Sequence, residues 1–131
     1  MGLLEEQFEE LRQEGLRRNG YAAVELTNIA NGTSLITLRE FALPSGWSKQ
    51  KATVYFLVPI GYPVARPDTF WTDPELQLAG GGIPVNTGTN QMEGVPPNLL
   101  WFSWHPSTWN PNRDNLITYA AMIRRRFDEL R

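Results

Sequence analysis

The distribution of proline is the feature that most constrains how this chain of 131 residues folds. Nine of its ten prolines lie between Pro59 and Pro111. Because proline fixes φ and lacks a backbone N–H donor, it is poorly tolerated inside helices and central strands. Regular elements are therefore expected before Pro59 and after Pro111, with a largely irregular segment between them.

The residues before the first strand predict an amphipathic helix. Leu4, Phe8 and Leu11 form one apolar stripe within residues 3–17, and the other positions are mainly glutamate, glutamine and arginine. Spacings of three and four residues match the helical period. The acidic face is expected to be solvated.

Alternating apolar and polar residues predict the strands that follow. Three of them are expected at residues 21–27, 35–43 and 52–58, and a short fourth at 69–71. In the third strand Val54, Phe56 and Val58 share one face, as the two-residue period of a strand requires. Strands this close in sequence are spaced for an antiparallel meander.

The end of the chain predicts a second helix. Apolar residues recur there every three or four positions, at Leu116, Ala120, Ile123, Phe127 and Leu130. Asn110 is a candidate cap and Pro111 suits a first helical turn. The arginines 124–126 fall near the negative end of the helix dipole, where a solvated role is expected.

This order predicts an α+β fold. It consists of an N-terminal helix, a four-stranded antiparallel meander, a long irregular loop over residues 73–110, and a C-terminal helix packed on the sheet. Val54, Phe56 and Val58 are expected to face the apolar stripe of the last helix. Residues 1–131 have a length typical of one domain.

Composition excludes several classes of function. The absence of cysteine removes any thiolate nucleophile, disulfide framework or cysteine-ligated zinc site. With a formal charge of −2, the chain lacks the net positive charge that is typical of proteins that bind nucleic acid. No apolar run or signal-peptide pattern suggests a membrane, so the cytoplasm is the expected compartment. Gly80–Gly82 lacks the lysine of a phosphate loop, and neither a metal nor a cofactor is expected.

Several motifs resemble the ubiquitin-conjugating-enzyme superfamily and its RWD relatives. Tyr62-Pro63 followed by Pro67 is similar to the connector between the third and fourth strands there, and Trp109 matches a tryptophan before the helix that follows the active-site loop. The runs GGGIPVNTG and WFSWHPSTWNP look like family E of the prokaryotic ubiquitin-conjugating-like proteins. The resemblance covers nearly the whole chain. It implies a UBC/RWD-like fold, with a ubiquitin-like protein and its activating enzyme as partners in bacteria.

Two departures from that superfamily bear on function. Its enzymes carry the ubiquitin-like protein as a cysteine thioester, and this chain has no cysteine. Its His-Pro-Asn motif is also missing, because His105-Pro106 is followed by Ser107. The chain is therefore expected to be a non-catalytic domain, a pseudoenzyme, that binds a ubiquitin-like protein or its activating enzyme in a bacterial conjugation or defence system.

Two alternatives stay open. The first is an atypical conjugating or acyl-transfer enzyme that uses His105, the only histidine, or a nearby serine, Ser103 or Ser107. A lone imidazole needs a positioned partner to be effective, and the sequence shows none. A structural histidine that hydrogen-bonds the loop backbone, or packs among tryptophans, is therefore favoured. The second alternative is a protein-interaction scaffold unrelated to ubiquitin-like proteins.

Three tryptophans accompany His105 in this segment, Trp101, Trp104 and Trp109. Because tryptophan is enriched in interface hot spots, these residues and His105 are the candidate binding residues. Aromatic residues in a segment without secondary structure also commonly form that segment's own core. At least two of the three are expected to pack in this way.

Overall fold

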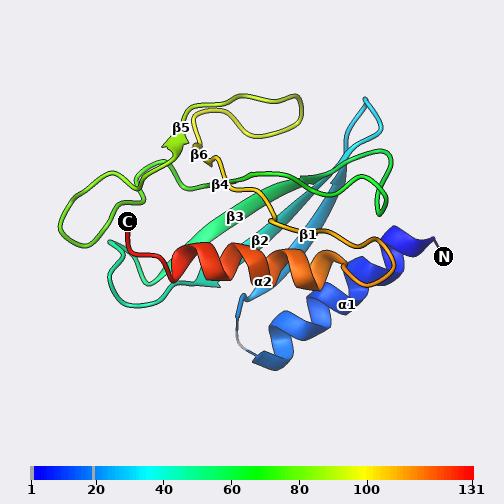
Figure 1. Cartoon of the computed structure of the whole chain (residues 1–131), viewed down its shortest axis with the longest axis horizontal. Coiled ribbons are helices and arrows are strands. Elements are labelled where there is room, and N and C mark those ends of the chain that lie inside the picture. The colour runs from blue at the N-terminus through cyan, green and yellow to red at the C-terminus, as the bar shows by residue number, and fades with distance from the viewer. Residues whose placement is uncertain (1, 19) are drawn as a thin grey trace.

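The computed structural model describes residues 2–18 and 20–131, and it places an antiparallel sheet beside two helices (Figure 1). The helices are α1 (Leu3–Arg18) and α2 (Leu116–Phe127). The strands are β1 (Ala23–Asn28), β2 (Ser34–Ala42), β3 (Lys51–Val58), β4 (Phe70–Thr72), β5 (Thr87–Gly88) and β6 (Leu100–Phe102). Their order in the sheet is β1-β2-β3-β4-β6-β5.

The predicted α+β arrangement, with a helix near each end and an antiparallel sheet between them, is confirmed, but the predicted number of strands is wrong. The sheet has six strands rather than four, because β5 and β6 lie within the segment that was expected to be irregular. Strand β6 pairs with β4 through Phe70↔Phe102 and Trp71↔Trp101. Strands of two and three residues are too short to show a period, so only their distant partners define them.

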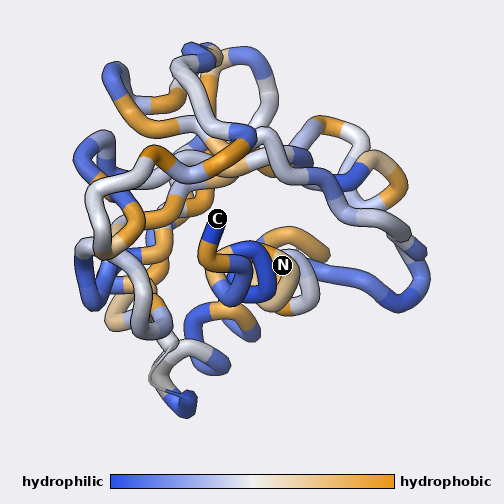
Figure 2. Tube along the Cα trace, turned by 60° about the vertical axis from the view of Figure 1, so that its left-hand side comes forward, coloured by the Kyte–Doolittle hydropathy of each residue, from blue (hydrophilic) through white to orange (hydrophobic). Residues whose placement is uncertain are grey.

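The main core lies between the sheet and the helices. Val54, Phe56 and Val58 are buried in the same cluster as α2 residues, as predicted. The ring of Phe56 lies 4.9 Å from that of Tyr119, measured between centroids. Figure 2 shows apolar stretches gathered in the strands on its left side. Because helices cover this face of the sheet, every second residue of β3 is apolar and buried. This alternation is what predicted the strand and its buried face.

Helix α2 begins later than predicted. Asn115, not Asn110, is the N-cap: its side chain accepts a hydrogen bond from the Thr118 backbone N–H at 3.1 Å, and the Thr118 hydroxyl accepts one from the Asn115 N–H at 2.7 Å. Asn110 and Asp114 instead close a separate turn, in which the Asn110 N–H donates to the Asp114 carboxylate at 2.7 Å. The helix ends at Phe127, so Leu130 does not extend its stripe and is 53% exposed.

Replacing Asn115 with alanine is expected to lower the free energy of unfolding by about 1 kcal/mol, because the Thr118 backbone N–H loses its side-chain acceptor. Asn112→Ala is the matched control, since Asn112 is exposed and lies in the preceding turn. Its effect should stay within about 0.5 kcal/mol. Urea titrations of the two variants measure the difference, and equal losses would contradict the assigned cap.

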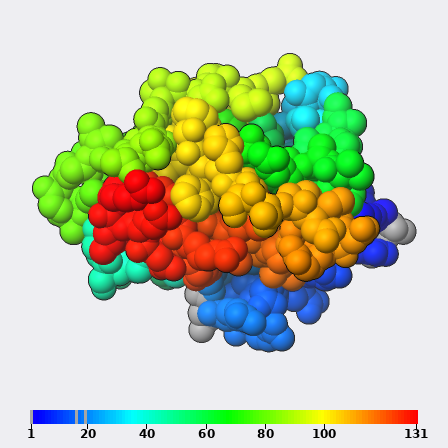
Figure 3. Space-filling model, in the orientation of Figure 1, coloured from blue at the N-terminus to red at the C-terminus, as the bar shows by residue number. Residues whose placement is uncertain are grey.

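The segment between β5 and β6 covers the other face of the sheet. Leu35, Trp71 and Val95 form a second buried cluster there, and the Trp71 indole N–H donates to the backbone oxygen of Asn90 at 2.7 Å. Figure 3 shows this segment, in yellow-green, as a layer along the top of the molecule. Gly94 has a φ of +86°, and a Cβ there would lie 2.2 Å from the Cδ1 atom of Ile29. Glycine is therefore required at this contact.

A glycine-containing turn precedes β5. The Gly81 N–H donates to the Leu78 oxygen at 2.8 Å, and the Leu78 N–H donates to the Gly82 oxygen at 2.9 Å. Leu78 also forms a β-bridge with Trp47, which ties the turn to the rest of the fold. Ile83, directly after the turn, is 75% exposed.

Arg126 departs from the solvated role expected of the three arginines. Its side chain is buried, with 2% exposure. The guanidinium donates to the backbone oxygens of Glu129 and Val85 at 3.0 Å and of Arg131 at 3.1 Å. Burial lowers the pKa of Arg126 from its ordinary value, because desolvation disfavours the charged form. Arg125 is exposed, as expected.

Within residues 2–18 and 20–131, neither helix is long and apolar enough to cross a membrane.

Candidate functional site

The sheet pairing brings His105 next to a carboxylate that is distant in sequence. The Nδ1 atom of His105 lies 2.5 Å from Oδ1 of Asp68. Asp68 precedes β4 and His105 follows β6, and these two strands are antiparallel neighbours. A hydrogen bond from the Thr69 N–H to the Trp104 oxygen, at 3.1 Å, continues the pairing up to the two side chains.

This contact fixes which nitrogen of the imidazole is free. A carboxylate beside Nδ1 favours a proton on that nitrogen and leaves the lone pair of the neutral ring on Nε2. No described residue forms a hydrogen bond with Nε2. The His105 and Asp68 side chains are 52% and 48% exposed, so the pair is accessible from solvent. The arrangement can accept a proton at Nε2.

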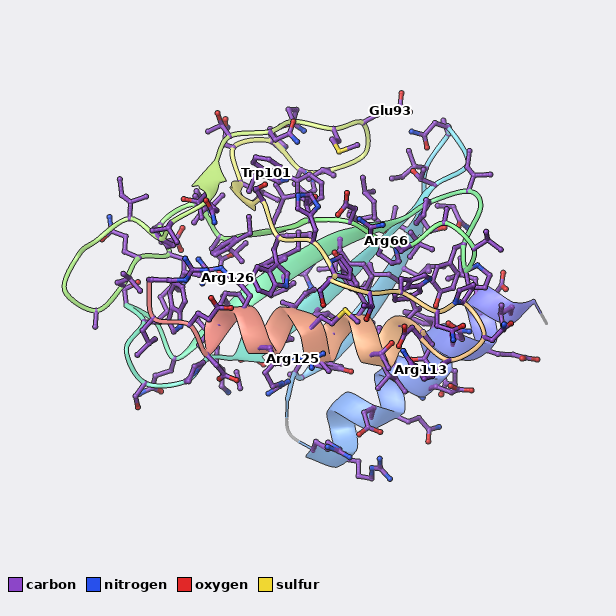
Figure 4. All side chains as sticks on the ribbon, in the orientation of Figure 1. Arg66, Glu93, Trp101, Arg113, Arg125 and Arg126 are labelled. Atoms are coloured by element: carbon purple, nitrogen blue, oxygen red, sulfur yellow. The ribbon has the colours of Figure 1, made fainter. Side chains whose placement is uncertain are left out.

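A pocket of about 380 Å³ opens beside the pair, on the sheet face that the β5–β6 segment covers. Leu57, Pro59, Met92 and Trp101 supply its apolar walls, and its polar lining comes from Thr33, Arg66, Asp68, Thr69, Asn90 and His105. Figure 4 shows Trp101 beneath the β5–β6 segment and Arg66 in the connector before β4. Within the described chain, no carboxylate forms an ion pair with Arg66. An apolar pocket with a few polar groups is typical of ligand sites.

A second pocket, of about 370 Å³, lies on the other side of the histidine. It separates the segment after β6 from helix α2, and its lining includes Trp104, Ser107, Arg125 and Glu129 as well as His105. His105 is therefore common to both pockets.

The predicted connector motif forms one contact region with Trp109. The Trp109 indole N–H donates to the backbone oxygen of Pro63 at 2.7 Å, and its ring lies 6.3 Å from that of Tyr62. The Tyr62–Pro63 peptide bond is cis, and Pro67 is buried. Tyr62, Pro63 and Trp109 are thus brought together, away from the lining of the two pockets beside His105.

The other two tryptophans lie beside His105 and are half-buried. Trp104 packs against the main core and Trp101 against the cluster under the β5–β6 segment. Both indole N–H groups are buried and have no hydrogen-bond partner among the described residues. Each ring forms the wall of one of the two pockets.

The two serines are not paired with the histidine. Ser103 is half-buried and its backbone N–H donates to the Asn86 oxygen at 2.8 Å, whereas Ser107 is exposed and lines the second pocket. Within the part of the chain that the structure describes, neither hydroxyl is hydrogen-bonded to His105.

The expectation that His105 hydrogen-bonds the loop backbone is wrong. The imidazole is half-exposed and its partner is the carboxylate of Asp68. Asp68 was missed because 37 residues separate it from His105, and no local spacing indicates that they meet.

The described ranges hold no candidate metal site. No group of three or more histidine or carboxylate residues there is placed to hold a metal ion.

Comparison with known proteins agrees with these features. A family model described as prokaryotic E2 family E matches residues 11–129, and E2 denotes the ubiquitin-conjugating type. No curated protein and no solved structure matches the chain. Because the match extends over nearly all of the elements described above, this chain belongs to prokaryotic E2 family E.

Proposed function

We propose that this chain is a ubiquitin-conjugating-like domain that binds a ubiquitin-like protein, its activating enzyme, or both, and that it forms no covalent intermediate. It would act in a bacterial conjugation or defence system. The observation that carries the proposal is membership of prokaryotic E2 family E in a chain without cysteine. Thioester transfer requires a thiolate, and none is available here.

The geometry around His105 supports the non-covalent part of the proposal. A serine becomes an effective nucleophile when a base is within hydrogen-bonding reach. Among the described residues neither Ser103 nor Ser107 has such a contact with the histidine. Trp101, Trp104 and His105 line adjacent pockets, so they are the proposed binding residues, with Trp109 at the Tyr62–Pro63 contact.

The test uses the purified chain, ATP, and a bacterial ubiquitin-like protein with its activating enzyme. We expect calorimetry to detect binding to at least one of the two proteins. Intact mass spectrometry should show no mass increase on this chain at any time. Binding without an adduct is the expected result, and absence of binding to both proteins would overturn the proposal.

A second candidate function is covalent transfer through a serine ester. The observation in its favour is that Ser107 lines the same pocket as His105. A hydroxylamine-sensitive adduct that disappears in folded Ser107→Ala, but persists in Ser103→Ala, would establish Ser107 as the nucleophile. The reverse pattern would identify Ser103. Binding only to proteins outside the conjugation system would instead favour a scaffold unrelated to ubiquitin-like proteins.

A further inference from the structure

The geometry points to Asp68 and His105 as a general-base pair that assists acyl transfer while the acyl group stays on another protein. In this step His105 accepts the proton of a nucleophile, and Asp68 is a positioning residue. The inference relies on the proposed function only for the source of the acyl group, which is a thioester held by the activating enzyme.

The first support is orientation. A base is effective when a second group fixes its ring and tautomer, and the 2.5 Å contact between Nδ1 and the Asp68 carboxylate supplies that group. The backbone hydrogen bond between Thr69 and Trp104 holds the two segments that carry the pair. The sheet therefore sets the relative orientation of the His105 and Asp68 side chains.

The second support is access. Half of the His105 side chain is exposed, and the residue lines both pockets. A nucleophile in one pocket and an acyl group in the other would therefore meet at the imidazole. Among the described residues Nε2 has no hydrogen-bond partner, so it is available to the proton of a nucleophile.

The third support is the charge around the imidazole. Besides Asp68, the charged groups that line the two pockets are Arg66 from the connector before β4, and Arg125 and Glu129 from the α2 side. Arg66 has no ion-pair partner among the described residues, so its guanidinium is available to a developing negative charge. Stabilising the negative charge that develops on an acyl oxygen commonly supplies a large part of the rate enhancement in acyl transfer.

The proposed step balances without a nucleophile from this chain. A neutral amine attacks the thioester carbonyl carbon, the C–N bond forms and the C–S bond breaks. The N–H proton passes to Nε2 of His105 and then to the departing thiolate. An amide and a free thiol are the products, and the imidazole returns to its neutral form. Water in place of the amine would give hydrolysis.

The first experiment examines the pair without any partner. Since His105 is the only histidine, long-range ¹H–¹⁵N spectra report its ring nitrogens without overlap. We expect the neutral ring to carry its proton on Nδ1 in the wild type. Asp68→Asn should shift the population toward the Nε2–H tautomer, and Asp68→Glu should restore it. Asp128→Asn, an exposed carboxylate at the end of α2, is the matched control and should change nothing.

The second experiment measures transfer from the preformed thioester of the activating enzyme to free lysine. The wild-type chain should accelerate transfer. His105→Gln should remove about 100-fold of the acceleration, and Asp68→Asn about 10-fold. Product analysis separates aminolysis from hydrolysis.

The outcomes distinguish this inference from the proposed function. If the chain binds its partners but gives no acceleration, or if His105→Gln and Asp68→Asn match the wild type, the general-base role is overturned and the binding role stands. An Nε2–H tautomer in the wild type also overturns it. If neither partner binds, the proposed function fails, and with it the assigned acyl source.

Discussion

Replacement of Phe56 with alanine is expected to lower the free energy of unfolding by about 3–5 kcal/mol, which is the range for a large aromatic residue removed from a well-packed core. Phe56 is fully buried on the helix-covered face of β3. Its ring packs against Tyr119 of α2. Tyr119 has little freedom to close the gap, because its hydroxyl donates to the backbone oxygen of Thr69 at 2.6 Å.

Phe56→Leu provides the control for this measurement. It keeps most of the apolar volume, so the expected loss is about 1–1.5 kcal/mol. Guanidinium titrations of the two variants and the wild type give both values. A loss below about 1 kcal/mol for Phe56→Ala would show that β3 and α2 do not pack as described.

Replacement of Arg126 with alanine is expected to cost about 3 kcal/mol of unfolding free energy, because it removes charge-assisted hydrogen bonds and a buried side chain together. Three backbone oxygens lose their partner in this variant, including that of Val85 in the segment before β5. The guanidinium also lies 5.3 Å from the centre of the Phe102 ring. That packing is lost as well.

Two variants separate the contributions at Arg126. Arg126→Met retains much of the volume but no donor, and it avoids the desolvation cost of a buried cation, so its loss should be smaller than that of alanine. Arg125→Ala changes an exposed neighbour and should stay within about 0.5 kcal/mol. Equal effects of alanine at 125 and 126, measured by thermal and urea unfolding, would contradict the buried position of Arg126.

The sequence predicted the elements whose signals are local. Apolar residues fall at alternate positions of β3 and at every third or fourth position of α2, because each element buries one face in the main core. The start of α2 was misplaced because Asn110-Pro111 has the composition of a cap. The turn closed by Asp114 occupies that position, and the capping box that begins the helix follows it.

The parts that the sequence did not predict depend on distant partners. Strand β6 exists because Trp101 and Phe102 pair with Trp71 and Phe70 of β4, about thirty positions earlier in the chain. The same pairing places Asp68 beside His105. A single histidine gave no sign of a partner, because the carboxylate that orients it belongs to a different strand connection. Composition cannot show that one arginine of three is buried, so the sequence predicts a solvated role for Arg126.

A label placed in the turn at residues 78–82 would report directly on whether a protein binds at this end of the sheet. A Cβ placed on Gly80 would meet no atom within 4 Å, so a larger side chain fits there without displacing a neighbour. Because the chain has no cysteine, Gly80→Cys would give it a single thiol, which a fluorescent or spin label would modify without background. The label would lie close to exposed Ile83. Changes in its emission or in its distance from a second label would then report whether a bound protein reaches this end of the sheet.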